Sequence, residues 1–179
     1  MIVLETERLI LRHVELGDTE SLYGVFGDVE VMRFGIGAQT LAWVKDWIAE
    51  QQDQYATRGF GAWAVMLKTS GGVIGYCGLF DFPDVNGQPE VEIGYRLARA
   101  HWGYGYATEA VTGVRDYAFE TLGMRRLIAM IDPHNSASIR VAIKAGMKYE
   151  SDVMFDGYDH PDHVYAIEQS NFEDGTEQR

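Results

Sequence analysis

The spacing of hydrophobic residues along the chain predicts the order of its helices and strands. Branched apolar residues at 8–14 predict a first strand, and a short helix follows Asp18, which is placed to cap it. Apolar residues then recur at helical spacing from 40 to about 57, and Gly59 ends that run. The first third of the chain is therefore expected to form one strand and two helices.

From residue 60 onward the hydrophobic period becomes that of strands. Residues 63–67 and 73–80 predict an antiparallel hairpin, and 81–89 contain the prolines and Asn-Gly pair that are typical of a loop. The strand expected at 90–97 alternates strictly, so that one of its faces carries Val91, Ile93, Tyr95 and Leu97. The opposite face carries Glu90, Glu92, Gly94 and Arg96 and is expected to meet something polar.

The last third of the chain alternates between helices and strands. Residues 108–122 predict a helix that ends at Gly123, and 126–131 predict a buried strand. This strand is expected to pair in parallel with its predecessor through a right-handed crossover. A helix from Asn135 or Ser136 to Lys144 and strands at 147–155 and 163–169 complete the pattern. We expect a single α/β domain over 1–170, with a central mixed sheet of seven strands and flanking helices, and a polar tail at 171–179.

Composition limits the size and the partners of this domain. The chain has 179 residues, of which 46% are hydrophobic and 23% charged, as in one folded domain. Fifteen Lys and Arg against 27 Asp and Glu give a formal charge of −12, which repels phosphate backbones and anionic lipid. Nucleic acid and membranes are therefore not expected as partners.

The cysteine content and the first residues bear on the compartment. Cys77 is the only cysteine, so it cannot form an internal disulfide, and we interpret it as a small buried hydrophobe and not a nucleophile. The opening residues have neither the basic segment nor the apolar run of a signal peptide. A cytoplasmic location is therefore expected.

A glycine-rich stretch between the strand at 90–97 and the helix at 108–122 is the first candidate for chemistry. Residues 102–110 read WGYGYATEA, so glycines let the backbone approach a ligand just where a helix begins. The free N–H groups of such a helix start suit a pyrophosphate. A plain strand-to-helix turn that needs small residues is the alternative, and the Gly-Lys-Ser/Thr ending of a P-loop is missing here.

With these residues the chain resembles the Gcn5-related N-acetyltransferase (GNAT) superfamily, and within it the RimJ/RimL-type ribosomal-protein N-acetyltransferases. The pyrophosphate motif of the superfamily is Gln/Arg-x-x-Gly-x-Gly/Ala, which Gly105 and Ala107 match, whereas Trp102 stands where Gln or Arg is usual. Further matches occur in the right order at 5–12, 91–97, 132–138 and 144–147. The resemblance therefore spans nearly the whole chain.

The resemblance implies acetyl-CoA as co-substrate and a site for it. The strands at 92–97 and 126–131 would splay apart, and the pantetheine arm would pair with their free backbone groups like an added strand. Gly94 would suit that approach, although a bulge is the alternative. The residues implied in cofactor binding are Tyr95, Leu97, Trp102, Gly103, Gly105, Tyr106, Ala107, Thr108, Asn135 and Ser138.

Acetyl transfer to an amine needs a group that removes a proton, because an alkylamine has a pKa of about 10.4. Glu92 is the candidate general base, directly or through a water, since it lies on the polar face of its strand next to the expected thioester. A solvent-facing carboxylate without a catalytic role is the alternative. Asp156 and Asp159, in the loop before the last strand, are rival bases.

The leaving thiolate needs a proton donor, and the resemblance assigns Ser138 to it. Ser138 occupies the Ser of the Asn-x-x-Ser pattern, and Asn135 would hold the pantetheine amides. Both residues could instead serve only in the first turn of their helix, as a cap and its neighbour. A backbone N–H near Tyr95 is the candidate for polarising the thioester carbonyl.

The acceptor and the remaining candidates are less sharply defined. Residues 156–163 hold carboxylates and imidazoles, but Pro161 breaks their spacing, so we expect no metal. Aromatic residues that either line an acceptor pocket or belong to the core are Trp43, Trp47, Tyr55 and Phe60. The subgroup resemblance implies direct transfer, in a ternary complex, to a protein N-terminal α-amine. A small amine is the alternative acceptor, a non-catalytic acyl-CoA-binding protein is the alternative class, and a homodimer is possible.

Overall fold

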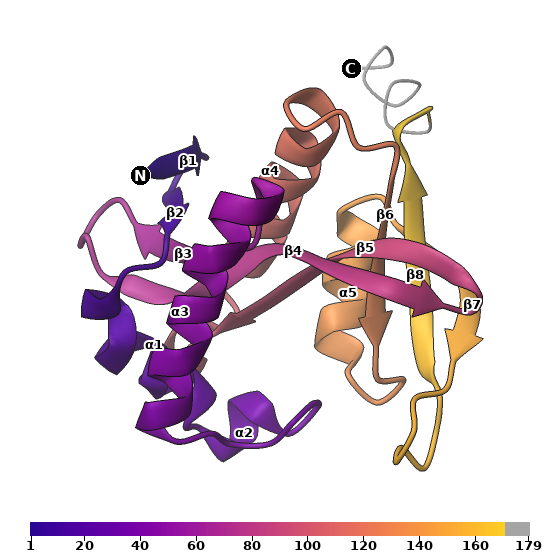
Figure 1. The fold of residues 1–179 in the computed structure, drawn as a ribbon, viewed down its shortest axis with the longest axis horizontal. Helices are drawn as coiled ribbons and strands as arrows, with labels where there is room; N and C mark the ends of the chain where they lie inside the picture. The colour runs from indigo at the N-terminus through magenta and orange to yellow at the C-terminus, as the bar shows by residue number, and fades with distance from the viewer. Residues whose placement is uncertain (171–179) are drawn as a thin grey trace.

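We describe residues 1–170 of a computed structural model of the chain (Figure 1). Its strands are β1 Ile2–Glu5, β2 Leu9–His13, β3 Ala62–Leu67, β4 Val73–Val85, β5 Gln88–Leu97, β6 Arg126–Ile131, β7 Lys148–Val153 and β8 Asp162–Glu168. Its helices are η1 Leu16–Asp18, α1 Thr19–Phe26, α2 Val29–Met32, α3 Leu41–Arg58, η2 Arg99–His101, α4 Tyr106–Glu120 and α5 Ser136–Lys144. The expected polar tail at 171–179 lies outside the described residues.

The strands form one mixed sheet in the order β1-β2-β3-β4-β5-β6-β8-β7. Its neighbours are antiparallel except β5 and β6, which run parallel. The single α/β domain is thus confirmed, but the described residues form eight strands where seven were predicted. The additional strand is β1, which has only four residues and exists because it pairs with β2 at the edge of the sheet.

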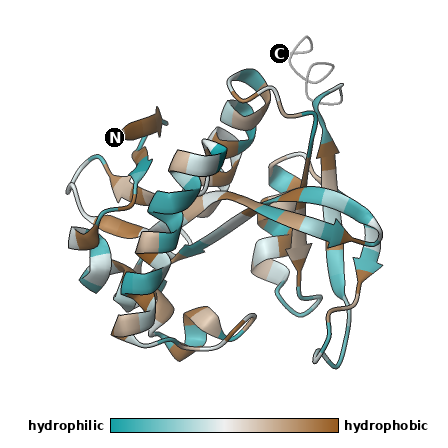
Figure 2. Ribbon diagram, viewed as in Figure 1, coloured by the Kyte–Doolittle hydropathy of each residue, from teal (hydrophilic) through white to brown (hydrophobic). Residues whose placement is uncertain are grey.

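Helices cover both faces of this sheet, as Figure 1 shows. α1 and α3 pack on one face in a core that includes Leu22, Val44 and Ile48, and α4 and α5 pack on the other. Figure 2 shows that α3 mixes hydrophilic and hydrophobic residues along its length, which suits a helix with one face in solvent. No helix among residues 1–170 combines the length and apolar content needed to cross a membrane.

Local signals explain where α3 begins and ends. The Thr40 hydroxyl accepts a hydrogen bond from the N–H of Trp43 at 3.1 Å, and Gly59 ends the helix with a left-handed φ of 79°. Asp18, in contrast, does not cap α1 as predicted. Its carboxylate instead binds the guanidinium of Arg12 through two hydrogen bonds of 2.6 and 2.8 Å, so tertiary pairing replaces the local cap.

The expected loop at 81–89 is mostly strand. β4 continues to Val85 and β5 begins at Gln88, and they are joined by Asn86 and Gly87, which both have positive φ. The strand pairing shifts register between Phe82 and Val85, and this irregularity accommodates Pro83. The long hairpin carries β5 across the middle of the sheet to β6.

The parallel pair at the middle of the sheet is the irregular feature of the fold. Among the described residues, β5 and β6 share a single pairing, between Glu92 and Ile128. Arg126, the first residue of β6, holds the two strands together before this pairing, because its guanidinium binds Glu90 of β5 at 2.9 Å as well as Glu150 and Glu168. Beyond Glu92 the two strands separate, which leaves a gap through the sheet.

Candidate active site

Two cavities meet at the gap between β5 and β6. The first, of about 550 Å³, lies toward α1 and α3, and we call it the aromatic cavity; its rings include Phe26, Trp43, Trp47, Tyr76, Phe80 and Phe82. The second, of about 340 Å³, lies toward the start of α4, and we call it the basic cavity. Residues that line both are Phe34, Tyr95, Arg96, Asn135, Ser138 and Val141. The two cavities therefore adjoin at the gap, and these six residues form the wall that both share.

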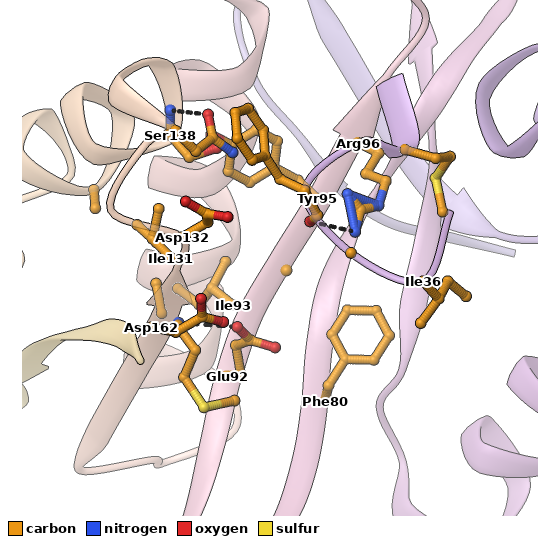
Figure 3. A pocket seen from close by; sticks show the side chains of 18 of the residues that line it. Ile36, Phe80, Glu92, Ile93, Tyr95, Arg96, Ile131, Asp132, Ser138 and Asp162 are labelled. Carbon is orange, nitrogen blue, oxygen red and sulfur yellow. Dashed lines mark hydrogen bonds between the residues drawn. The ribbon is translucent and has the colours of Figure 1, made fainter. Parts of the chain in front are cut away.

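Glu92 lies at the point where the strands separate (Figure 3). Its Oε1 accepts a hydrogen bond from the N–H of Met130 at 3.0 Å, so the side chain takes up an amide beyond the last backbone pairing of β6. Burial raises the pKa of Glu92 to about 7, although the Met130 bond and the charge of Arg96 act against that rise. A carboxylate with this pKa can accept a proton near neutral pH.

Tyr95 and Ser138 form a hydroxyl pair in the shared wall. The Tyr95 hydroxyl donates to Ser138 Oγ at 3.0 Å, which leaves the Ser138 proton free to point elsewhere. Burial raises the pKa of Tyr95 to about 12, so its phenol keeps its proton at neutral pH. Tyr95 therefore donates to Ser138, and Ser138 can donate its own proton to a group in the gap.

Asn135 is the N-cap of α5, which is the structural role that the sequence offered as an alternative to cofactor binding. Its Oδ1 accepts from the N–H of Ser138 at 3.2 Å, which caps the helix. Asn135 also lines both cavities, so the capping role leaves its amide beside the gap. The bounds of α5 follow from this cap and agree with the predicted helix from Asn135 or Ser136 to Lys144.

The glycine-rich stretch forms a turn that opens α4. Gly103 and Gly105 have φ values of 82° and 83°, which L-residues with side chains rarely adopt. The first intrahelical bond runs from Glu109 N–H to Gly105 O at 3.1 Å, so the N–H groups of 106–108 precede it and are left without intrahelical acceptors. Gly103, Gly105 and 106–108 all line the basic cavity.

Trp102 and Leu97 belong to the same edge of the basic cavity. The indole N–H of Trp102 donates to Leu97 O at 2.7 Å, which fastens the glycine turn to the end of β5. This bond gives Trp102 a bracing function at the position where Gln or Arg is usual in the family it resembles. Trp102 is 43% exposed, so it also presents apolar surface beside the cavity.

The charged residues that line the basic cavity are mostly positive, although the chain as a whole is negative. Arg33, His101, Arg140 and Lys144 line it, together with the shared Arg96, whereas Glu30 is its only acidic residue among those described. The chain as a whole has a formal charge of −12. A cavity with this lining favours an anionic ligand locally.

The aromatic cavity has three acidic residues among its described lining: Glu92, which the sequence predicted, and Asp132 and Asp162, which it did not. Asp156 and Asp159, the predicted rival bases, are exposed and do not line the cavity, whereas Asp162 from the same segment does. Burial raises the pKa of Asp162, and the charge of Asp132 adds to the rise. Asp132 also lines the cavity, and Figure 3 shows the carboxyl group of Asp162 beside that of Glu92, with Asp132 further along the same cavity.

Asp132 also organises two histidines at the edge of the cavity. Its oxygens bind the ring nitrogens of His134 at 3.0 Å and His160 at 3.1 Å. Burial acts against ionisation of Asp132, but these bonds and one from the His134 N–H hold its pKa below the ordinary value. The loop residue His160 therefore has a neighbour, Asp132, that the sequence pattern did not reveal.

The four aromatic candidates divide between site and core. Trp43 and Trp47 line the aromatic cavity, with the Phe26 ring 5.0 and 4.9 Å from theirs. Tyr55 and Phe60 do not line it: Phe60 packs against the core on the α4 face of the sheet, and Tyr55 packs against the cores on both faces. Cys77 is fully buried, and burial raises the pKa of its thiol, which fits the predicted small hydrophobe.

The sheet opens at a parallel strand pair, and a glycine turn begins a helix beside the gap. This combination is typical of one class of acyltransferase folds. Residues 8–148 match the model of the acetyltransferase (GNAT) domain. The chain therefore belongs to the GNAT family and is an N-acetyltransferase.

Relatives of similar length support the same assignment. The chain is 37% identical over 151 residues to the uncharacterized protein YkkB of Bacillus subtilis (strain 168), a match that covers 84% of this chain and 87% of that protein. It is 36% identical over 143 residues to the uncharacterized N-acetyltransferase p20 of Bacillus licheniformis, with 79% of each chain covered. These matches cover most of the described domain.

Solved structures share the fold. An acetyltransferase of the GNAT family from Bacillus anthracis superposes with a TM-score of 0.80 at 26% identity, covering 95% of this chain and 99% of its own. A spermidine N-acetyltransferase from Vibrio cholerae, solved with CoA and spermine, has a TM-score of 0.76 at 16% identity, with 94% and 99% covered. At that identity the second likeness concerns the fold alone.

Proposed function

We propose that the chain transfers the acetyl group of acetyl-CoA directly to a primary amine in a ternary complex. One observation carries this proposal: the gap between β5 and β6 joins a basic cavity to a cavity that holds a carboxylate whose pKa is about 7. An anionic cofactor and a cationic amine would approach the gap from opposite sides. Their reacting groups would meet at the shared wall.

The basic cavity is the proposed site of acetyl-CoA. Its pyrophosphate would bind the N–H groups of Gly103, Gly105 and 106–108, where the helix dipole also favours negative charge. The pantetheine arm would lie along Tyr95 and Leu97 in the gap and contact Asn135 and Ser138. Trp102 would flank the turn. Every cofactor-binding residue predicted from the sequence lines this cavity.

The chemistry takes two protons from the ammonium group, one before and one after attack, and gives one proton to the thiolate. Glu92 would accept the ammonium proton, directly or through a water, and the neutral amine would attack the thioester carbonyl. The new C–N bond forms as the carbonyl becomes an oxyanion, which a backbone N–H near Tyr95 would stabilise. The C–S bond then breaks and Ser138 donates its proton to the sulfur, while the nitrogen loses its second proton to solvent. Ser138 recovers a proton from solvent, directly or relayed through the Tyr95 hydroxyl.

For the acceptor, we propose a protein N-terminal α-amine, because the strongly acidic chain would attract a basic partner. A small-molecule amine is the second candidate, and a specific observation favours it. The aromatic cavity has about 550 Å³ and rings on several sides, which is within the usual range of small-molecule sites. Both candidates use the same gap and the same base.

One experiment tests the cofactor and the acceptor together. Purified protein would first be titrated with acetyl-CoA by calorimetry, where we expect saturable binding with a dissociation constant of about 1–100 μM. Release of CoA would then be followed with basic N-terminal peptides, the same peptides with blocked α-amines, and small amines as acceptors. Turnover with free but not blocked peptides supports the first acceptor, and turnover with small amines alone supports the second. Binding without turnover on any amine would support a non-catalytic acyl-CoA-binding protein.

A further inference from the structure

The turn between β1 and β2 is fastened to the first turn of α4, about a hundred residues away in the chain. The Glu109 carboxylate accepts three hydrogen bonds there: from the Thr6 hydroxyl at 2.5 Å, from the Arg8 N–H at 2.7 Å and from Arg8 Nε at 2.6 Å. These bonds hold the pKa of Glu109 below its ordinary value even though burial acts to raise it. The side chain of Glu109 is 15% exposed and that of Arg8 is 42% exposed, so the carboxylate is largely shielded from solvent and the guanidinium is not.

The same arginine reaches from Glu109 to the glycine turn. Arg8 Nη1 donates to the carbonyl of Tyr104 at 3.0 Å, and its guanidinium carbon lies 4.6 Å from the centre of the Tyr106 ring. A Cβ built on Gly105 would lie 3.5 Å from Arg8 Nη2. Arg8 thus touches residues 104–106 from behind, since it does not itself line the basic cavity.

We propose that Thr6, Arg8 and Glu109 are positioning residues for the pyrophosphate of acetyl-CoA; this inference rests on the proposed function. Together they hold the carbonyl of Tyr104 turned away from the basic cavity, so that neighbouring N–H groups face it. They also neutralise Glu109, a carboxylate in the first turn of α4 whose charge would otherwise repel a bound phosphate. None of the three is required to contact the cofactor.

Gly113 makes this arrangement possible and offers a neutral way to disturb it. It lies one helical turn after Glu109, and a Cβ there would come within 2.8 Å of Thr6 Cγ2 and 3.2 Å of Leu4 Cδ1. Gly113→Ala would therefore push the turn off α4 without changing any charge. Thr6→Val removes the hydroxyl with its 2.5 Å bond to Glu109 and the 3.2 Å bond that it accepts from the Leu9 N–H.

The test measures binding of CoA, which requires no knowledge of the acceptor. We expect Arg8→Met to raise the dissociation constant of CoA about tenfold or more, the size of one lost charge-assisted hydrogen bond, and Arg8→Lys to restore it only in part. Thr6→Val and Gly113→Ala should raise it in the same direction. Lys68→Met is the matched control, because it removes the ion pair with Glu5, at 2.9 Å, and leaves the bonds to Glu109 in place.

A second probe separates positioning from general damage. The pantetheine-free part of CoA, 3′-phosphoadenosine 5′-diphosphate, would be measured by displacement, and its affinity should fall by the same factor as that of CoA. Melting temperatures of ligand-free variants report fold damage independently, and Thr6→Val keeps the test valid if Arg8→Met does not fold. Unchanged affinity in folded Arg8→Met and Thr6→Val would overturn the inference alone. Failure of the unaltered protein to bind CoA would overturn the proposed function and this inference with it.

Discussion

The two cavities on either side of the β5–β6 gap differ in charge and in how they are built. The basic cavity is formed around a helix start and has Arg33, Arg140 and Lys144 near exposed backbone N–H groups. The aromatic cavity is formed by packed rings and has Glu92, Asp132 and Asp162 at one side. One small domain with a formal charge of −12 therefore separates opposite local charges across the thickness of its sheet.

This difference teaches how the fold handles two oppositely charged substrates. Backbone N–H groups recognise phosphate whatever the side chains are, so the basic cavity depends on the shape of one glycine turn. The aromatic cavity depends on individual side chains, because rings from α1, α3 and β4 and the carboxyl groups of Glu92, Asp132 and Asp162 line it. Substitutions should therefore alter acceptor choice more readily than cofactor choice.

The sharpest way to break the comparison is Glu92→Gln. Gln can still accept the Met130 N–H bond, so the gap should persist while the base is lost. We expect kcat to fall about 100- to 1,000-fold with acetyl-CoA affinity unchanged. Steady-state rates and calorimetry on the same preparation measure both, and Asp156→Asn, which alters an exposed carboxylate outside the cavity, is the control.

The pH profile sharpens the same assignment. Only deprotonated Glu92 accepts a proton, and its pKa is raised to about 7. The rate should thus rise with pH up to about 7 and fall about tenfold per unit below it. The matching effect on stability has the opposite sense, because a carboxyl with a raised pKa favours the folded state below its unfolded pKa and loses this contribution as pH rises through about 7. An acid limb that survives in Glu92→Gln would assign the base to another group.

Ser138→Ala should have the next largest effect. The serine lies in the wall common to both cavities, and its loss removes the proposed proton donor to the thiolate, so we expect kcat to fall about 30- to 100-fold. Ser136→Ala, two residues earlier in the same helix and exposed, is the matched control. Equal rates for the two variants would leave Ser138 as only a residue of the first helical turn.

The charge of the basic cavity can be tested without touching the gap. Arg140→Ala combined with Lys144→Ala should raise the dissociation constant of CoA about tenfold and weaken its dependence on salt, because fewer cations face the phosphates. The KM of the acceptor should not change. Lys45→Ala, on the exposed side of α3, serves as control. An equal loss of acceptor affinity would show that the two compartments are not independent.

The smallest expected effect is that of Tyr95→Phe. This change removes the 3.0 Å bond to Ser138 Oγ but keeps the ring in the wall. We expect kcat to fall about threefold, in line with one neutral hydrogen bond. Single-turnover rates measure it, and a fall as large as that of Ser138→Ala would make Tyr95 the direct donor to the thiolate.

The parts of the molecule that follow from local signals could be predicted from sequence. The bounds of α5 depend on Asn135 and on residues within one turn of it, and β6 was predicted at the residues it occupies. The edge strand β1 was missed because only its pairing with β2 makes four residues a strand. The resemblance to a known family supplied the gap, which hydrophobic periodicity alone does not encode.

The candidate site divides in the same way. Glu92 could be proposed because strand alternation places it on the polar face, and the glycine turn has a local motif. Asp132 and Asp162 could not, since they meet only through the pairing of β6 with β8, in which Ile131 lies opposite His163. Arg8 and Glu109 were likewise beyond reach, because their contact spans about a hundred residues.

The single pairing between β5 and β6 has a consequence for how the molecule comes apart. Strands β1–β5 come from residues 2–97 and strands β6–β8 from 126–168, so each side of the gap is one continuous stretch of chain. The sheet therefore consists of two consecutive halves of the chain. The ion pair of Arg126 with Glu90 connects them at one end, and α4 packs against both. A ligand arm that pairs with both strands would link the two halves while it is bound, and the halves would then unfold as one unit.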